Sequence, residues 1–344
     1  MSRSRRRSPL KRERGVAIVT VLLIVALAAT LAASVAWREL VAVHDVSNQR
    51  LGVETMWAER AAVEWARVML RDQSRTSNVA YVGQQWSSPV NDVRVAGFLP
   101  DDALKVNSDL ANAYVSGSIE DEQAKFNVTD LVSRPVPSAP WQVNQSGLQA
   151  YQRLLTHVSL DPALADQTAR YMLRSLGITD ASAGGGAHDP ASFSDSDGSS
   201  KWPLQLVSVD DLVRVPGYSP QMVKTLSESV TLLPDFTNIN ANTANEAALV
   251  ASIPDLSGSQ ALMLIQRRGT AHFLSGGDIA TVLSPTTGSQ LPLGSLIDVN
   301  SNYFLVHCRI HSSRINTRID TLIARHGIGS FAWTTVVWVH RLSV

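Results

Sequence analysis

Residues 12–36 read RERGVAIVTVLLIVALAATLAASVA, a charged junction followed by 21 residues, 16–36, that carry no charge. A helix of that length spans about 30 Å, the hydrocarbon thickness of a bilayer. Seven basic residues and one acidic residue precede the apolar run, within residues 1–15. The positive-inside rule therefore predicts a single-pass membrane protein with residues 1–15 in the cytoplasm, a transmembrane segment at 16–36 and the rest outside.

The alternative for a basic start followed by an apolar run is a secretory signal peptide that is cleaved off. The run is longer than the usual apolar core of such a signal, and Ala32-Ala33-Ser34 is a weak cleavage site. The helical spacing of apolar residues also continues to about Arg71, and residues 10–88 contain no proline. We expect one helix of about 55 residues, on the order of 80 Å long, whose second half at 37–71 packs on a globular head.

The junction Arg12-Glu13-Arg14-Gly15, with the apolar run after it, resembles the processing segment of type IV prepilins and type II pseudopilins. In those families a membrane aspartyl peptidase, the prepilin peptidase, cuts on the cytoplasmic side after the glycine and methylates the new N-terminus. The resemblance implies a cytoplasmic leader at 1–15, cleavage between Gly15 and Val16, and N-methylation of Val16.

Most members of these families carry a glutamate at the fifth mature position, thought to pair with the N-terminal ammonium of a neighbouring subunit. This chain has Thr20 there. Because a carboxylate buried in a membrane is costly without its partner, the absence of the glutamate suggests a subunit that has no preceding neighbour. The K-type minor pseudopilins of type II secretion systems resemble this chain in lacking it, which implies a place at the tip of the filament.

The sequence after the long helix predicts a pilin-like head in two parts, at 72–140 and 286–344. Residues 113–127 (AYVSGSIEDEQAKFN) read as a hairpin-like pair of strands. Near the C-terminus, residues 301–306 and 308–325 read as two antiparallel strands with alternating faces. The resemblance to pseudopilins implies that the chain returns here to complete the sheet of the head.

Between the two parts of the head, residues 141–285 predict an inserted α-helical domain. Apolar residues have helical spacing at 147–176, and 181–203 is a loop rich in glycine, serine and aspartate. Residues 209–223 (VDDLVRVPGYSPQMV) and 247–261 (AALVASIPDLSGSQA) align at an offset of 38, each as two short helices around a proline-led turn. They predict helix-hairpin-helix-like (SAM-like) repeats, and the K-type pseudopilins resemble this chain in carrying an insertion of this kind.

The same repeat raises the alternative of a membrane-anchored DNA-binding competence protein, because residues 240–244 (NANTA) and the helices after them look like a helix-hairpin-helix. Such hairpins present backbone N–H groups, freed by paired glycines, to a phosphate. The first copy has only Gly217, and Asp255 in the second would put a carboxylate where the phosphate must approach. The residues after position 36 also carry 23 basic against 29 acidic groups, so we expect no nucleic-acid partner.

Calcium is the metal that the sequence favours. Asp189, Asp195 and Asp197 lie in the glycine- and serine-rich loop and offer oxygen ligands to a hard cation, although solvated aspartates are the competing interpretation. K-type pseudopilins bind calcium near a Gly-Ala-Glu-Asp stretch, which reads Gly186-Ala187-His188-Asp189 here. Only the aspartate matches, so the resemblance implies that at least one calcium site is weakened or lost. No cofactor is required.

No catalytic set stands out, because the sequence lacks the Gly-x-Ser-x-Gly and His-Glu-x-x-His motifs. We therefore expect no enzyme, which counts against a secreted hydrolase. His307 and His311 have the spacing of a helix face but lie in a strand-like region, and this disfavours a zinc pair. Cys308 is the one cysteine, so an intrachain disulfide is excluded.

Together these observations predict an α+β fold: a pilin-like long N-terminal helix, an antiparallel sheet head and a large inserted α-helical domain. The resemblance to K-type minor pseudopilins implies a subunit that initiates or caps the periplasmic pseudopilus of a type II secretion system and so helps to export folded proteins across the outer membrane. It implies the I- and J-type minor pseudopilins, the prepilin peptidase and the inner-membrane secretion platform as partners, with the chain anchored in the bacterial inner membrane. A minor pilin of a type IV pilus is the remaining alternative, which the size of the insertion disfavours.

Overall fold

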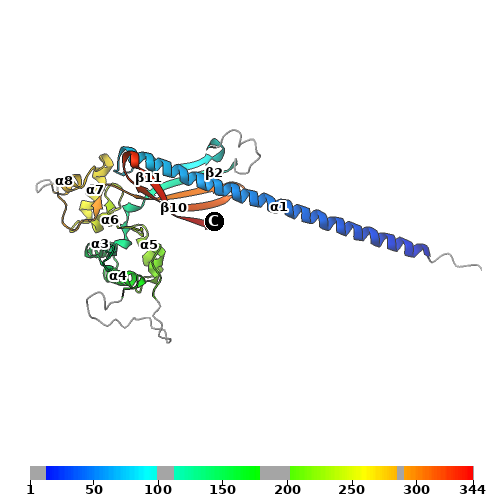
Figure 1. Ribbon diagram of the computed structural model, residues 1–344, viewed down its shortest axis with the longest axis horizontal. Coiled ribbons are helices and arrows are strands. Elements are labelled where there is room, and N and C mark those ends of the chain that lie inside the picture. Colours follow the sequence, from blue (N-terminus) through cyan, green and yellow to red (C-terminus); the bar gives the residue numbers. More distant parts are fainter. Residues whose placement is uncertain (1–12, 99–111, 179–201, 285–289, 344) are drawn as a thin grey trace, which may run out of the picture.

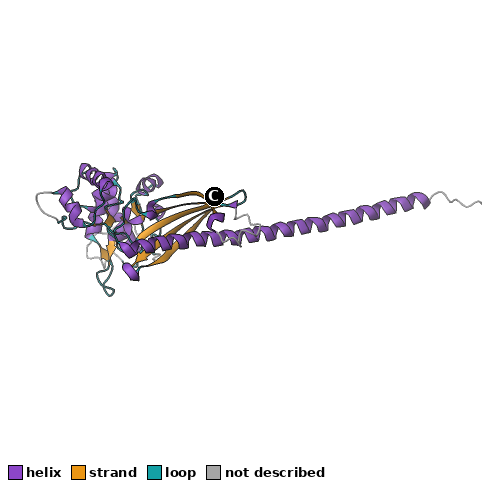
Figure 2. Cartoon of the chain, turned by 90° about the horizontal axis from the view of Figure 1, so that it is seen from above, coloured by secondary structure: helices purple, strands orange, loops and turns teal. Residues whose placement is uncertain are grey.

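The computed structural model describes residues 13–98, 112–178, 202–284 and 290–343. A long helix, α1 (Glu13–Thr76), extends far out of the molecule, and its second half lies against a five-stranded antiparallel sheet (Figure 1). A helical domain lies beyond the end of α1, on the side away from the N-terminus, and Figure 2 shows the same order of elements from above. The predicted α+β fold, with its long N-terminal helix and antiparallel sheet, is confirmed.

The long helix is unbroken and extends past both ends of the predicted range, 16–71. It continues through the charged junction because neither a proline nor a β-type alternation interrupts the helical pattern there. Its second half is amphipathic: Val63, Ala66 and Leu70, three and four residues apart, are buried against the sheet. The first half of the helix is therefore suited to a lipid environment, and the second half packs on the sheet.

The sheet combines strands from both ends of the soluble region. In spatial order its strands are β1 (Val90–Arg94), β2 (Tyr114–Asp121), β9 (Tyr303–His311), β10 (Asn316–His326) and β11 (Trp333–Ser343). β9 and β10 confirm the antiparallel pair predicted near the C-terminus. The last strand, β11, extends the sheet beyond the elements that the sequence predicted. Alternate residues of β9 from Phe304 to Ile310 face α1 and are buried there.

The predicted hairpin at 113–127 is wrong. β2 ends at Asp121 and pairs with β9, from Tyr114 opposite His311 to Asp121 opposite Phe304. The Asp121 side chain accepts a hydrogen bond from the Gln123 N–H and so caps a 3-10 turn, which directs the chain away from the sheet. The next short strand, β3 (Phe126–Asn127), pairs in parallel with β6 (Val230–Thr231). Alternating residues showed that strands were present but could not identify their partners.

We call residues 122–302, between β2 and β9, the inserted domain. Its helices are α3 (Gln145–His157), α4 (Ala163–Ser175), α5 (Pro220–Leu226), α6 (Glu246–Ser252), α7 (Gly258–Thr270) and α8 (Gly276–Leu283). In the same domain the short strand β4 (Val132–Ser133) pairs with β5 (Gln142–Val143), and β7 (Ile239–Asn240) pairs with β8 (Ile297–Asp298). Its 3-10 helices are η4 (Glu122–Ala124), η5 (Val128–Leu131) and η7 (Val209–Arg214), and the head has η1 (Gln85–Ser87), η2 (Val95–Phe98) and η8 (Gly329–Phe331).

The two aligned stretches each fold as a helix, a turn and a helix. In the first, η7 precedes α5, and in the second, α6 precedes α7. Ser219 and Ser257, which fall at the same place in the alignment, both act as N-caps: their hydroxyls accept from the N–H of Met222 and Gln260. The first copy differs in beginning with a 3-10 helix. The SAM-like description of these units stays a prediction.

A buried polar group, which we call the polar junction, joins the inserted domain to the sheet. The Asp121 Oδ2 atom accepts hydrogen bonds from Ser301 Oγ at 2.6 Å, Thr243 Oγ1 at 2.6 Å and Asn240 Nδ2 at 2.9 Å. Asn240 Nδ2 also lies 2.9 Å from the carbonyl oxygen of Ala80, just after α1. Burial raises the pKa of the Asp121 carboxyl, while these donors act in the opposite direction.

A buried arginine extends this connection to the long helix. Arg325, on β10, is 1 % exposed and donates from Nη2 to the carbonyl oxygen of Ser301 at 2.6 Å. Its Nη1 donates to the Gln73 side chain near the end of α1, and its guanidinium carbon lies 5.1 Å from the Phe304 ring centroid. Burial lowers its pKa to about 10. The residue thus holds helix, sheet and inserted domain at one point.

A second buried carboxyl lies deeper in the inserted domain. Asp130 Oδ1 accepts from the N–H of Thr237 and from Asn127 Nδ2, each at 3.2 Å. Asn127 in turn receives the N–H of Leu233 at 3.0 Å. Burial raises the pKa of Asp130 from its ordinary 3.8 to about 8, so the folded state favours the protonated carboxyl.

We predict that Asp130 makes the protein less stable as pH rises. Because the folded pKa lies above the unfolded one, the free energy of unfolding falls as pH rises from about 4 through 8, by on the order of 3 kcal/mol between pH 5 and pH 8. Asp130→Asn keeps the accepting oxygen but does not titrate, so its melting temperature should fall less over this range. Thermal unfolding of the full chain in detergent, followed by circular dichroism, measures the difference.

The matched control is Asp210→Asn, which alters an exposed carboxyl. It should lose stability with pH in parallel with the parent chain. Parallel curves for the parent and Asp130→Asn would contradict the role assigned to the buried carboxyl.

Candidate functional site

The first half of α1 is an exposed apolar surface. Every residue from Ala17 to Val46 is exposed, including Leu23 at 65 %. α1 is the one described helix that is long and apolar enough to cross a membrane, and none of its most apolar window is buried in the chain. So large an apolar surface is stable only when lipid or other apolar helices cover it. This half of the helix is therefore an interaction surface.

The processing residues lie on this helix. Gly15 and Val16 fall in its first turns, so the predicted cleavage point is at the start of a helix. The hydroxyl of Thr20 donates to the carbonyl oxygen of Ala17 at 2.9 Å and so is satisfied within the helix. Thr20 needs no partner from another chain, unlike a glutamate at that position. Cleavage and methylation stay predictions.

The second half of α1 is fixed to the head by polar contacts along the sheet. Arg314, in the turn between β9 and β10, donates to Asn48 Oδ1 at 3.0 Å. Arg341 of β11 pairs with Glu59, and Arg67 donates to the carbonyl oxygen of Thr334 at 2.8 Å. The helix is therefore braced on the head from about Asn48 onward, and the part before it is free of the head.

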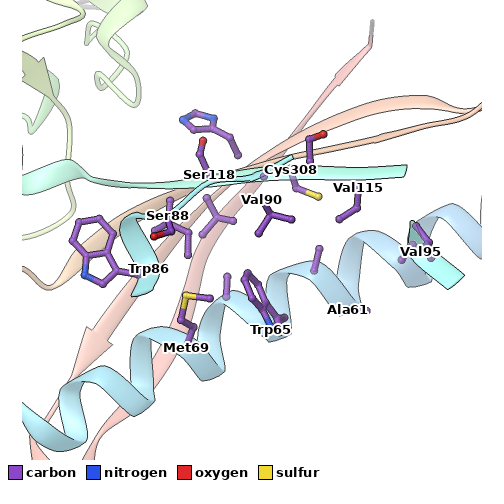
Figure 3. Close-up of a pocket in the computed structure, with 18 of the residues that line it drawn as sticks. Ala61, Trp65, Met69, Trp86, Ser88, Val90, Val95, Val115, Ser118 and Cys308 are labelled. Atoms are coloured by element: carbon purple, nitrogen blue, oxygen red, sulfur yellow. The ribbon is translucent and has the colours of Figure 1, made fainter. Parts of the chain in front are cut away.

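An apolar cleft lies between α1 and the β1–β2 side of the sheet (Figure 3). Its volume is about 550 Å³. Trp65, Ala61 and Met69 on α1 line one wall, and Val90 and Val115 line the other. Trp65 is 48 % exposed, so the cleft is open to solvent beside this side chain. The cleft is a second apolar surface, on the half of α1 that packs on the head.

Cys308 lies on the sheet wall of this cleft and is 5 % exposed. Burial raises the pKa of its thiol to about 12, so it stays protonated at neutral pH. A protonated, buried thiol is a poor nucleophile and a poor metal ligand. The cysteine is thus part of the apolar core, with no chemistry of its own at this site.

The two candidate histidines of the C-terminal strands do not form a metal pair. His307 Nδ1 lies 2.6 Å from Asp320 Oδ1, and its Nε2 lies 3.7 Å from Glu120 Oε1. The nearby carboxylate of Glu120 is the main cause that raises the pKa of His307, and Asp320 acts in the same direction. His311 lies four residues along β9, on the order of 13 Å away, and stacks on Tyr114. Among the described residues, no group of three or more His, Cys, Asp or Glu side chains is arranged so that it could hold a metal ion.

The predicted calcium ligands Asp189, Asp195 and Asp197 lie at 179–201, outside the described residues, so calcium binding stays a prediction. Sequence reasoning also missed Asp121 and Arg325, which join the inserted domain to the sheet, and Asp130, which is buried inside the inserted domain. Asp121 stands in the run IEDEQ, which reads as an exposed acidic turn. No local pattern distinguishes a buried carboxylate from a solvated one, because its side-chain donors Ser301, Thr243 and Asn240 are more than a hundred positions away.

Comparison with known proteins gives consistent matches. Two family models, both described as type II secretion system protein K, match residues 124–235 and 239–303, together just over half of the chain. The type II secretion system protein K of Aeromonas hydrophila is 24 % identical over 92 % of this chain and 94 % of its own length. That of Pseudomonas aeruginosa is 25 % identical over 80 % of each.

A solved structure has a similar fold. It is a chain of the GspK-GspI-GspJ complex from the type 2 secretion system of enterotoxigenic Escherichia coli, with a TM-score of 0.60 and 18 % sequence identity. The match covers 86 % of this chain and 99 % of the other. At this identity the likeness shows the fold.

We predict that Cys308 is unreactive in the folded chain. With a thiol pKa near 12 the thiolate fraction at pH 8 is roughly a thousandfold below that of a free cysteine, and burial slows the reaction further. An aromatic disulfide reagent should label the chain quickly only after unfolding in urea. As a control, Leu293→Cys, at a position that is 99 % exposed, should be labelled at once in the folded state. If the reagent labelled Cys308 at the same rate before and after unfolding, this would contradict the burial of its side chain in the wall of the cleft.

Proposed function

This chain belongs to the type II secretion system protein K family, and we propose that it is the minor pseudopilin at the tip of the periplasmic pseudopilus, where it initiates or caps assembly. As a member of this family it is a minor pseudopilin of the protein-transport machinery. The family is structural, and we propose that the chain has no catalytic activity. Its contribution to the export of folded proteins across the outer membrane is mechanical.

The observation that carries the proposal is the continuity of α1. An uncharged, exposed half joins without a break to a half that is braced on the head by Glu59, Arg67 and Leu70. A cleavable signal or a simple anchor does not need this rigid joint. A subunit that must be drawn out of the membrane into a filament does, because force on the head has to reach the helix.

The place at the tip rests on two features. Thr20 satisfies its hydroxyl within its own helix and offers no carboxylate to the N-terminus of a preceding subunit. The inserted domain lies at the end of α1 away from the N-terminus, to one side of the helix axis (Figures 1 and 2). A subunit stacking above this one would need the space that the inserted domain takes.

We propose the I- and J-type minor pseudopilins as direct partners. The likeness to a chain solved in complex with GspI and GspJ supports this choice. The helices of these partners would lie along the exposed half of α1 and continue to the cleft beside Trp65 and Met69. Before assembly, the prepilin peptidase and the inner-membrane secretion platform would act on the chain, with its leader in the cytoplasm and its head in the periplasm.

The structure gives no support to DNA binding by the inserted domain. Arg268, at the end of α7, donates to the carbonyl oxygens of Ala241 at 2.8 Å and Ala244 at 2.6 Å. Arg153 donates to the carbonyl oxygen of Ala251 at 2.6 Å. These cations are engaged within the domain and are not presented to a phosphate backbone.

Co-expression with a prepilin peptidase, followed by mass spectrometry of the N-terminus, tests the proposal. We expect a mature chain that starts at Val16 with one N-methyl group. Gly15→Leu should block cleavage, because the peptidase cuts after that glycine. Gly52→Leu is the matched control: Gly52 is exposed on the same helix with open space around it, so this variant should be processed normally. A mature chain that starts beyond residue 30 would show a cleaved signal peptide and contradict the filament function.

We also propose that Asp189, Asp195 and Asp197 bind calcium, supported by the oxygen-rich composition of residues 186–197. Titration calorimetry of the full chain in detergent should give heat on calcium addition, and the melting temperature should rise. Replacing all three aspartates by asparagine should abolish both effects, whereas Asp210→Asn should not. Absence of heat and of a thermal shift in the parent chain would remove the proposal.

A further inference from the structure

The C-terminal strand β11 is the outer strand of the sheet. On one side it pairs with β10 along its whole length, from Trp333 opposite His326 to Ser343 opposite Thr317. On its other side no described strand pairs with it. Alternate backbone N–H and C=O groups of an antiparallel edge strand point away from its neighbour, so β11 presents a row of hydrogen-bonding groups.

This edge lacks most of the devices that protect natural edge strands. Such strands are normally short or carry charges, prolines or inward-pointing lysines. Residues 333–339 (WTTVVWV) contain no charge, proline or glycine. Their apolar side chains are exposed on both faces of the sheet, with Trp333 at 52 %, Trp338 at 40 % and Val339 at 56 %. An irregularity in the pairing leaves Val337 without a partner on β10, and Val337 is itself 40 % exposed.

The charges of β11 lie at one end. His340 and Arg341 follow the apolar stretch, and Arg318 of β10 lies opposite Leu342. Arg341 contacts Glu59 of α1, whereas Thr334, at the other end of the strand, contacts Arg67. The strand therefore runs antiparallel to α1, and its cationic end is the one nearer the membrane-spanning half of the helix.

We propose that β11 binds an extended segment of a different protein, which adds a sixth strand antiparallel to β11. The carbonyl oxygen of Thr334 on this edge already accepts from Arg67. Main-chain hydrogen bonds to the edge beyond Thr334 would supply the affinity, and the exposed apolar side chains on both faces would select a segment of alternating aliphatic residues. An acidic residue at the start of that segment meets His340, because Arg341 lies on the opposite face of the strand and pairs with Glu59. The added strand runs parallel to α1, away from the membrane.

A second copy of this chain fits the edge less well than a different protein does. This conclusion rests on the proposed function, in which every copy is anchored in the same membrane. Two copies anchored in one membrane have their β11 strands pointing the same way, so the edges meet only in parallel. Parallel pairing is slightly less stable per residue. In register it also sets His340 and Arg341 beside their own copies, which places like charges in contact.

The distance from the membrane fits a partner with a head of its own. Arg341 lies beside Glu59, which is about 35 Å along α1 from the end of the uncharged run. The edge is thus well outside the bilayer and open to a protein in the aqueous compartment. The same feature makes β11 accessible in the purified chain.

The test uses the full chain in nanodiscs and a labelled nine-residue peptide that begins with glutamate and then alternates valine and threonine. Fluorescence anisotropy should show saturable binding, and hydrogen exchange of the amides at 333–339 should slow at least tenfold. Two further peptides carry N-methyl groups on alternate amides, one on each edge. Only one of these two should lose binding, because a single edge of the peptide pairs with β11. Loss of both, or of neither, would overturn the proposal.

A protein variant gives the second readout. Val337→Lys places a charge on the edge and should weaken peptide binding at least tenfold. Leu293→Lys, at the fully exposed position in the inserted domain, should bind as the parent chain does. Equal binding by Val337→Lys and the parent would overturn the proposal, as would a dimer of the parent chain that Val337→Lys dissolves. Since processing at Gly15 is measured separately, failure here leaves the test of the proposed function intact.

Discussion

The buried carboxylate of Asp121 is the constraint on which the two-part architecture depends. The chain leaves the sheet after β2 and returns to it at β9, and these strands are neighbours, so the two ends of a long insertion must meet. Asp121 stands at the exit, Ser301 at the return and Asn240 in the middle of the inserted domain. A carboxylate that is only 5 % exposed is costly unless its donors are in place. The insertion and the sheet therefore reach their arrangement together.

Much of the surface of the described chain is apolar. α1 buries Val63, Ala66 and Leu70 on the head. The first half of α1, the cleft beside Trp65 and the edge of β11 are not covered by any described part of the chain. These three surfaces differ in what covers them well: lipid or parallel helices for the first, a helix for the second, an extended strand for the third. All three are typical of surfaces that bind other molecules.

The inserted domain shows where local sequence rules hold. Ser219 and Ser257 align in the repeat because each caps the helix that follows, and capping depends on residues three positions apart. The predicted hairpin at 113–127 failed for the opposite reason. Its alternation is real, but the partner of β2 lies almost two hundred residues away in β9, and Asp121 bends the chain out of the sheet. β11 escaped prediction because apolar residues on both faces remove the alternation that marks a strand.

The sequence by itself determined the long helix, its uncharged apolar run, the C-terminal strand pair and the helical nature of the insertion. Each of these follows from periodicity, charge or capping among residues that are close in sequence, because the chain itself holds such residues near one another. The tertiary structure alone decided that Asp121, Asp130 and Arg325 are buried, that Cys308 is an inert wall of a cleft and that β11 is a free edge. Those properties depend on neighbours brought together from distant parts of the chain, and burial has no local signature because the groups that desolvate and satisfy a side chain are not beside it in sequence.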